Sequence, residues 1–231
     1  MEQQTFTMHA VAHIESDFAE KFGIPRQSGL VDALRARVVF EPPYRDPSAL
    51  RGIEQFSHIW LLWQFTQAMR DGWSPTVRPP RLGGNTRVGV FATRSPFRPN
   101  PIGLSCVRLE GVEQDPALGP VLLVRGADLL DGTPIYDIKP YIPFADSHPD
   151  AAEGYTAQTR GYHLEVRCPD ALRAPLAPEQ WAALAGVLAG DPRPSYQDDP
   201  SRVYGMRFAG HQVRFTVADG VLTVCEITPE G

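Results

Sequence analysis

The sequence predicts a mainly β protein in which a barrel or strongly curved antiparallel sheet is followed by a small α+β unit. The first observation behind this prediction is a series of short strand patterns with Gly and Pro between them. The second is that no helical segment long enough for regular βαβ crossovers separates these patterns. Together they favour a barrel over a Rossmann-type, doubly wound parallel sheet.

Apolar alternation marks the strands of the N-terminal part. We expect strands at residues 6–14, 37–40, 56–65, 86–91, 104–109 and 121–124. A later stretch, residues 137–141, also follows a period of two, which would place Asp137, Lys139 and Tyr141 on one face.

A second unit is predicted after residues 145–160, whose composition is that of a linker or long surface segment. We expect a strand at 162–166, a helix at 178–189 that has proline in its first turn and Gly190 at its end, and a hairpin of 213–217 with 222–225. The predicted domains are therefore residues 1–158 and 159–231.

Composition and charge limit the classes of function that the chain can have. The 231 residues are 42% hydrophobic and 10% aromatic, enough for a sizeable core. The net charge of −5 is unevenly distributed, +4 over residues 1–109 and −9 over 110–231, so an anionic partner is not excluded. We expect no metal, because His9 and His13 lack a third ligand nearby.

The cellular compartment follows from cysteine usage and from the absence of targeting patterns. Cys106, Cys168 and Cys225 are far apart and odd in number, which argues against a disulfide framework or a zinc knuckle. No signal-peptide pattern begins the sequence, and no apolar stretch approaches the roughly 20 residues that a membrane helix needs. We predict a soluble protein of the reducing cytoplasm.

An acid-free, arginine-rich segment lies between Asp71 and Glu110. Its arginines are Arg78, Arg81, Arg87, Arg94, Arg98 and Arg108. Prolines stiffen this segment, glycines allow close approach of a ligand, and guanidinium groups suit phosphate and carboxylate. A merely solvated loop is the alternative. Alternation of the arginines with Val88, Val90 and Phe91 favours the anion-binding interpretation.

Common enzyme motifs are absent: there is no Gly-x-Gly-x-x-Gly, Walker-type Gly-Lys-Ser/Thr, Gly-x-Ser-x-Gly or His-Glu-x-x-His. The run Asp-Gly-Thr-Pro at 131–134, taken alone, is ordinary β-turn chemistry. The run becomes more informative because it is one of six motifs that occur in one order. They are Phe-Gly-Ile-Pro-Arg-Gln at 22–27, Pro-Pro-Arg-Leu-Gly-Gly at 79–84, the run from Gly89 to Gly103, residues 131–134, Asp-Ile-Lys-Pro-Tyr at 137–141, and Asp-Pro-Arg-Pro-Ser-Tyr at 191–196.

These motifs together resemble those of the TrmO-type (TsaA-like) tRNA methyltransferases over nearly the whole chain. The resemblance implies an S-adenosylmethionine-dependent enzyme on a small β-barrel with a C-terminal α+β domain, working as a homodimer. Its implied substrate is N6-threonylcarbamoyladenosine beside the anticodon of certain tRNAs, which is methylated at N6.

The resemblance also implies a set of cofactor contacts. These residues are Pro25, Arg26, Gln27, Thr66, Gln67, Arg94, Leu104, Asp131, Gly132, Thr133 and Pro134. Thr66 stands where the family pattern leads us to expect histidine. Threonine can still donate and accept a hydrogen bond, but a role specific to imidazole would be lost.

The implied reaction requires a proton acceptor, because a ureido-like nitrogen loses its proton as it attacks a methyl group. We predict Asp137 as the general base, with Lys139 and Tyr141 orienting the substrate. A structural ion pair between Asp137 and Lys139 is the alternative.

Substrate anions are assigned to the arginine-rich segment and to the second unit. The threonyl carboxylate and the anticodon-loop phosphates are expected at Arg81, Arg98 and Asn100. Arg193 and Tyr196 could hold the tRNA, although prolines after a helix are equally a stop signal.

Two other functions remain open. The first is a noncatalytic barrel that binds RNA or a small anionic ligand, and the second is methylation of another small molecule on the same scaffold.

Overall fold

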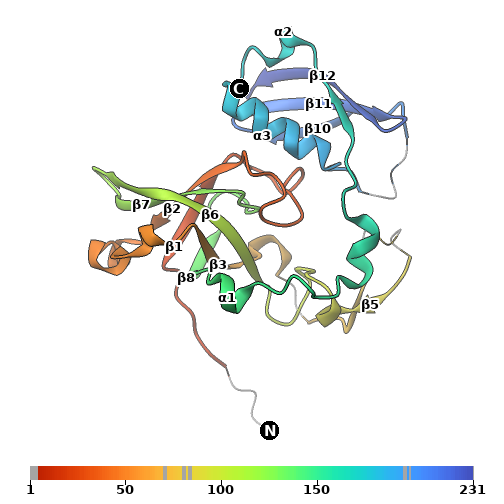
Figure 1. The fold of residues 1–231 in the computed structure, drawn as a ribbon. Helices are drawn as coiled ribbons and strands as arrows, with labels where there is room; N and C mark the ends of the chain where they lie inside the picture. The colour runs from red at the N-terminus through yellow and green to blue at the C-terminus, as the bar shows by residue number, and fades with distance from the viewer. Residues whose placement is uncertain are drawn as a thin grey trace.

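The computed structural model describes residues 5–69, 72–79, 82, 85–194, 197 and 199–230. These residues form a six-stranded sheet, a two-stranded hairpin and a second unit with a four-stranded sheet (Figure 1). The prediction of a mainly β protein with a smaller second unit is confirmed.

Six antiparallel strands make the first sheet. They are β1 (Ala12–Ser16), β2 (Arg35–Phe40), β3 (His58–Gln64), β6 (Ile102–Asp115), β7 (Gly119–Arg125) and β8 (Pro134–Pro140). Their order is β1-β2-β7-β6-β3-β8, and β1 also pairs with β8, so the sheet closes into a barrel. Alternate side chains point inward: on β3, Ile59, Leu61 and Trp63 are buried in the barrel core.

The first strand begins later than predicted. We expected residues 6–14, but β1 spans Ala12–Ser16, and Ala12 lies opposite Phe40, the last residue of β2. Beyond Phe40 the chain enters Pro42 and Pro43, which have no backbone N–H to extend the ladder. Strand β2 therefore does not continue far enough to pair with residues 6–10.

Short 3₁₀ turns connect β2 to β3. They are η1 (Pro42–Tyr44), η2 (Pro47–Leu50) and η3 (Ile53–Gln55).

A long excursion joins β3 to β6. It contains η4 (Thr66–Ala68), the paired strands β4 (Thr76–Val77) and β5 (Val88–Gly89), and η6 (Val90–Ala92). The strand expected at 86–91 is thus only two residues long, and the prediction of a longer strand was wrong. Val90 turns into η6, and its N–H donates to the carbonyl oxygen of Pro75 instead of continuing a ladder (3.0 Å).

The second unit combines a sheet with one long helix. Its elements, with those leading to it, are α1 (Pro143–Asp146), η7 (Gly154–Thr159), β9 (Glu165–Arg167), α2 (Asp170–Arg173), α3 (Pro178–Ala189), β10 (Tyr204–Phe208), β11 (His211–Ala218) and β12 (Val221–Pro229). The sheet order is β10-β11-β12-β9. Helix α3 begins and ends at the predicted residues, with Gly190 as its C-cap.

Strand β10 was not predicted, although the sequence carries its signal. Tyr204, Met206 and Phe208 are buried, while Gly205 and Arg207 between them are exposed. This is the alternation of a strand with one buried face.

The second core contains residues from the N-terminal part of the chain. Phe18, Val31 and Leu34, which lie between β1 and β2, pack in the same cluster as α3 and β10–β12. The ring of Phe18 lies 5.5 Å from that of Phe208. The predicted boundary after residue 158 stays a prediction, since this packing crosses it.

No helix among the described residues is long and apolar enough to cross a membrane. In the same part of the chain, no three His, Cys, Asp or Glu side chains gather as a metal site.

Candidate functional site

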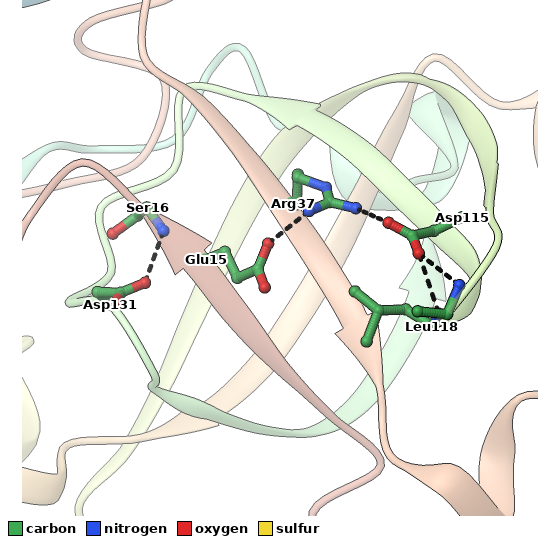
Figure 2. Close-up of polar contacts among 7 residues, drawn as sticks. Glu15, Ser16, Arg37, Asp115, Leu118 and Asp131 are labelled. Carbon is green, nitrogen blue, oxygen red and sulfur yellow. Dashed lines mark hydrogen bonds and ion pairs between the residues drawn. The ribbon is translucent and has the colours of Figure 1, made fainter. Parts of the chain in front are cut away.

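The turn before β8 is attached to the end of β1. The backbone N–H of Ser16 donates to Oδ1 of Asp131 (2.9 Å), as Figure 2 shows. The N–H of Gly132 donates to Ile14 (2.8 Å), and that of Asp131 donates to Phe18 (2.9 Å). Gly132 has a φ of 71°, a conformation that glycine adopts without strain. These bonds hold residues 131–134 in one place, with Thr133 buried and Asp131 exposed.

An open concavity lies beside Asp131. Its lining residues are Glu15, Ser16, Asp17, Arg35, Ala36, Arg37, Glu110, Leu123 and Asp131. Arg37 bridges Glu15 (2.9 Å) and Asp115 (2.8 Å), as Figure 2 shows, so its charge is already balanced. Burial, followed by the nearby charge of Asp131, raises the pKa of Asp17.

The three predicted catalytic residues lie together on the outer side of β8 and its continuation. Asp137 and Lys139 form an ion pair (2.8 Å) in which both side chains are about half exposed. Lys139 lies opposite Trp60 on β3, and the Tyr141 ring is 5.8 Å from that of Trp60. The expected common face is therefore present, and so is the ion pair of the alternative interpretation.

A bulge sets the position of Asp137. Leu62 pairs with Asp137 while the next residue of β3, Trp63, pairs with Ile135, so Tyr136 is an extra residue in β8. A bulge re-aims the neighbouring side chains. The hydroxyl of Tyr136 donates to Gln64 at the end of β3.

Gln27 and Arg94, both predicted cofactor residues, are brought together from segments 67 positions apart. Arg94 donates a hydrogen bond to the side-chain oxygen of Gln27. The charge of Arg94 also acts on a group that the sequence patterns did not indicate, the carboxyl of Asp128; burial raises the pKa of Asp128, and the charge of Arg94 partly opposes this rise.

Asp128 ends a buried hydrogen-bond chain. Trp63 donates its indole N–H to Ser105 Oγ (2.9 Å), and Ser105 donates to Asp128 Oδ1 (2.6 Å). Burial is the largest effect on Asp128 and raises its pKa, although the Ser105 bond and the Arg94 charge oppose it. The sequence signal was weak, because a single aspartate after a strand is ordinary turn chemistry.

The other predicted cofactor residues come from three segments of the chain. Thr66 and Gln67 are exposed on η4, directly after β3, and Leu104 is 53% exposed on β6. Pro25 is half-buried, while Arg26 reaches toward the second unit and donates to the carbonyl oxygen of Arg193 (3.3 Å).

Of the predicted RNA-binding residues, the structure describes Arg98, Asn100 and Arg193. Arg98 donates to the carbonyl oxygen of Thr93 in its own loop (3.1 Å), and Asn100 is exposed nearby. Arg81 and Tyr196 lie outside the described residues.

Arg193 is held inside the second unit. Its side chain is 8% exposed and makes two bonds to Asp191, at 2.9 and 3.0 Å. Burial opposes ionisation of Asp191, but the bonds and charge of Arg193 outweigh it and lower the pKa of Asp191. This placement favours the structural role for Arg193, and its contact with RNA stays a prediction.

Comparison with known proteins covers both units. The family model of the tRNA-methyltransferase O N-terminal domain matches residues 13–147, and the TrmO C-terminal domain model matches residues 162–230. The chain is 41% identical over 235 residues to the tRNA (adenine(37)-N6)-methyltransferase of Escherichia coli (strain K12), which covers 97% of this chain and 99% of that protein.

Two Pseudomonas aeruginosa proteins are also similar. A protein described as a putative S-adenosylmethionine-dependent methyltransferase RcsF is 45% identical over 216 residues, covering 88% of this chain and 89% of its own. The crystal structure of TrmO from this organism superposes with a TM-score of 0.80 at 36% identity, covering 99% of both chains.

Proposed function

Because this chain belongs to the tRNA-methyltransferase O family, we propose that it methylates N6 of threonylcarbamoyl-modified adenosine next to the anticodon of tRNA, using S-adenosylmethionine. Relatives named as tRNA (adenine(37)-N6)-methyltransferases align with nearly the full chain. The observation that carries the substrate proposal is this match together with the shared outer face of Asp137, Lys139 and Tyr141.

The residues assigned to the cofactor suit its chemical groups. Arg94 presents a guanidinium that fits a carboxylate, Asp131 presents a carboxylate that fits hydroxyl or ammonium groups, and exposed Leu104 presents apolar surface to adenine. S-adenosylmethionine supplies a methyl group that its sulfonium already activates. The remaining assigned contacts, Pro25, Arg26, Gln27, Thr66, Gln67 and residues 132–134, belong to the same proposal.

The chain's own groups then align the substrate and accept its proton. Orientation of two reactants removes about 7 to 11 kcal/mol of a barrier, so positioning is the larger task. The attacking nitrogen has its lone pair drawn toward the carbamoyl group and the purine. Asp137 takes the proton that this nitrogen loses, while Lys139 and Tyr141 hold the modified base.

Arg98 and Asn100 are proposed to meet the threonyl carboxylate and the loop phosphates. Arg98 is already bonded to carbonyl groups of its own loop, which fixes the direction of its guanidinium and leaves donors for an anion. Arg81, Arg193 and Tyr196 complete the set proposed from the sequence.

Three further properties are proposed. The family resemblance implies that the protein works as a homodimer. The linker composition of residues 145–160 supports a domain boundary between residues 158 and 159, and cysteine usage supports action in the cytoplasm.

The test is methylation of tRNA that carries the threonylcarbamoyl modification. Purified protein, S-adenosylmethionine and EDTA are incubated with this tRNA, and nucleosides are analysed by mass spectrometry. We expect the mass of the modified adenosine to rise by one methyl group. Binding of both ligands without any methylation would instead support the noncatalytic barrel.

A further inference from the structure

An exposed pair of aromatic rings lies beside the β4–β5 hairpin, outside the residues assigned above. Trp73 and Phe91 are 55% and 73% exposed, and their ring centroids are 6.1 Å apart with 36° between the planes. Aromatic side chains contribute much of the energy of cores and interfaces, so two exposed rings in contact point to a partner.

The hairpin fixes the position of this pair. Thr76 pairs with Gly89 and Val77 with Val88, and the N–H of Val90 donates to the carbonyl oxygen of Pro75 (3.0 Å). Trp73 precedes this ladder closely and Phe91 follows it directly. The ladder therefore brings the two ends of the hairpin together, which places the two rings side by side. Figure 1 places β5 away from the six barrel strands.

The surrounding charge is positive. Residues 72–109 contain no acidic residue. Arg87 is fixed on the hairpin by a bond from its Nη1 to Thr76 Oγ1 (3.0 Å), and Arg78 is exposed at the end of β4. A partner that complements this surface carries negative charge and flat apolar faces.

Single-stranded nucleic acid has both properties. Its phosphates suit guanidinium groups, and its unpaired bases expose faces that stack on aromatic rings. Paired bases in a duplex stack on each other and hide those faces.

We propose that Trp73 and Phe91 stack an unpaired base of the tRNA anticodon loop, and that Arg78 and Arg87 contact the phosphates beside it. This inference rests on the proposed function and adds to it the surface that recognises the single-stranded loop.

The experiment measures binding of an anticodon stem-loop RNA and of a fully paired RNA duplex to the full chain. Trp73→Ala and Phe91→Ala should each weaken stem-loop binding by about tenfold or more, the usual effect of removing one stacking ring. Neither change should alter duplex binding. Trp73→Phe, which keeps a ring, should retain most of the affinity.

Phe6→Ala is the matched control, because Phe6 is 84% exposed but lies outside the arginine-rich segment. It should bind both RNAs as the wild type does. Calorimetry with S-adenosylmethionine should give unchanged cofactor affinity for every variant, which also shows that each one is folded.

Three results would overturn the proposal. The first is wild-type stem-loop affinity in both alanine variants, and the second is an equal loss of duplex binding. The third is a change in the mass of the protein in solution with RNA affinity unchanged, which would assign the rings to a contact between copies. Failure of the proposed function is recognised separately, because it appears as a lack of tRNA methylation by the wild type, whereas the surface proposal is judged by the stem-loop affinities of the variants.

Discussion

Asp137 is considerably exposed to solvent, and within the described part of the chain Lys139 is its ion-pair partner. Its ion pair with Lys139 is 2.8 Å long, and its side chain is 45% exposed. Exposed ion pairs contribute only about 0 to 1 kcal/mol to stability. A purely structural role would therefore be a small one, and the two interpretations predict different measurements.

Asp137→Asn should lower single-turnover methylation by a factor on the order of 10² to 10⁴, because the amide keeps the shape but cannot accept the proton. Cofactor affinity, tRNA affinity and the melting temperature should stay close to wild type. Rapid-quench measurement with saturating tRNA checks the rate. A near-normal rate, with at most a small loss of stability, would support the structural ion pair and move the base elsewhere.

Asp128 provides a test that depends on pH. Its pKa is raised above the usual 3.8, chiefly by burial, so the fold disfavours the ionised carboxyl. The protonated carboxyl of Asp128 therefore contributes to the stability of the wild type at low pH. This contribution is lost as the pH rises from 3.8 through the raised pKa. Asn at this position stays neutral and can still accept the bond from Ser105.

Asp128→Asn should thus melt like the wild type at the acid end and at a higher temperature above the raised pKa. Melting curves of both proteins across this pH range measure the difference. Cofactor affinity should fall, because Arg94 loses the opposite charge that it faces. A variant that is less stable than wild type at neutral pH would show that the attraction of Arg94 outweighs the cost of burial.

At the scale of elements, β3 and β6 pair closely at the point where the site begins. Gly103 on β6 lies opposite Trp63 on β3, and a Cβ at Gly103 would be 2.2 Å from the Trp63 ring. The ring also donates to Ser105, which bonds Asp128. The packing of these two strands is therefore linked, through Trp63, to the hydrogen bonds that join Ser105 and Asp128.

Gly103→Ala should cost about 1 to 3 kcal/mol of unfolding free energy, because the buried ring must move to admit the methyl group. Urea denaturation measures this cost. Gly111→Ala is the control on the same strand, since nothing lies within 4 Å of a Cβ there. Equal stability of the two variants would contradict the close packing of Trp63.

The molecule as a whole has two cores that share one part of the chain. Segment 17–34 leaves β1, contributes Phe18, Val31 and Leu34 to the second core, and returns to the barrel as β2. A backbone hydrogen bond joins this segment to the second unit, because the N–H of Ala209 donates to the carbonyl oxygen of Asp17 (3.0 Å). Both units should therefore unfold together.

Phe18→Ala should destabilise the protein by about 3 to 5 kcal/mol, the usual cost of emptying a buried aromatic site. Phe18 is 1% exposed. Urea unfolding should remain a single transition when it is followed by far-ultraviolet circular dichroism and by tryptophan fluorescence. Phe144→Ala, at a side chain 92% exposed, should change little. Two separate transitions, with only one shifted, would show that the units fold independently.

Local sequence patterns were sufficient for most elements and for the family. Alternation located the barrel strands approximately, and proline and glycine located both ends of α3. The order of six motifs identified the methyltransferase family. These features depend on neighbouring residues, whose spacing is visible in the sequence itself.

Only the tertiary structure decided which distant groups meet. It closed β1 onto β8, placed Phe18 in the second core, joined Gln27 to Arg94 beside Asp128, and buried Arg193 against Asp191. Such contacts depend on how strands pair and how the chain returns between them, and a local period of two or 3.6 residues carries no information on either. The sequence alone therefore determined the elements and the chemistry available, and the packing of the two cores determined which of these groups lie together.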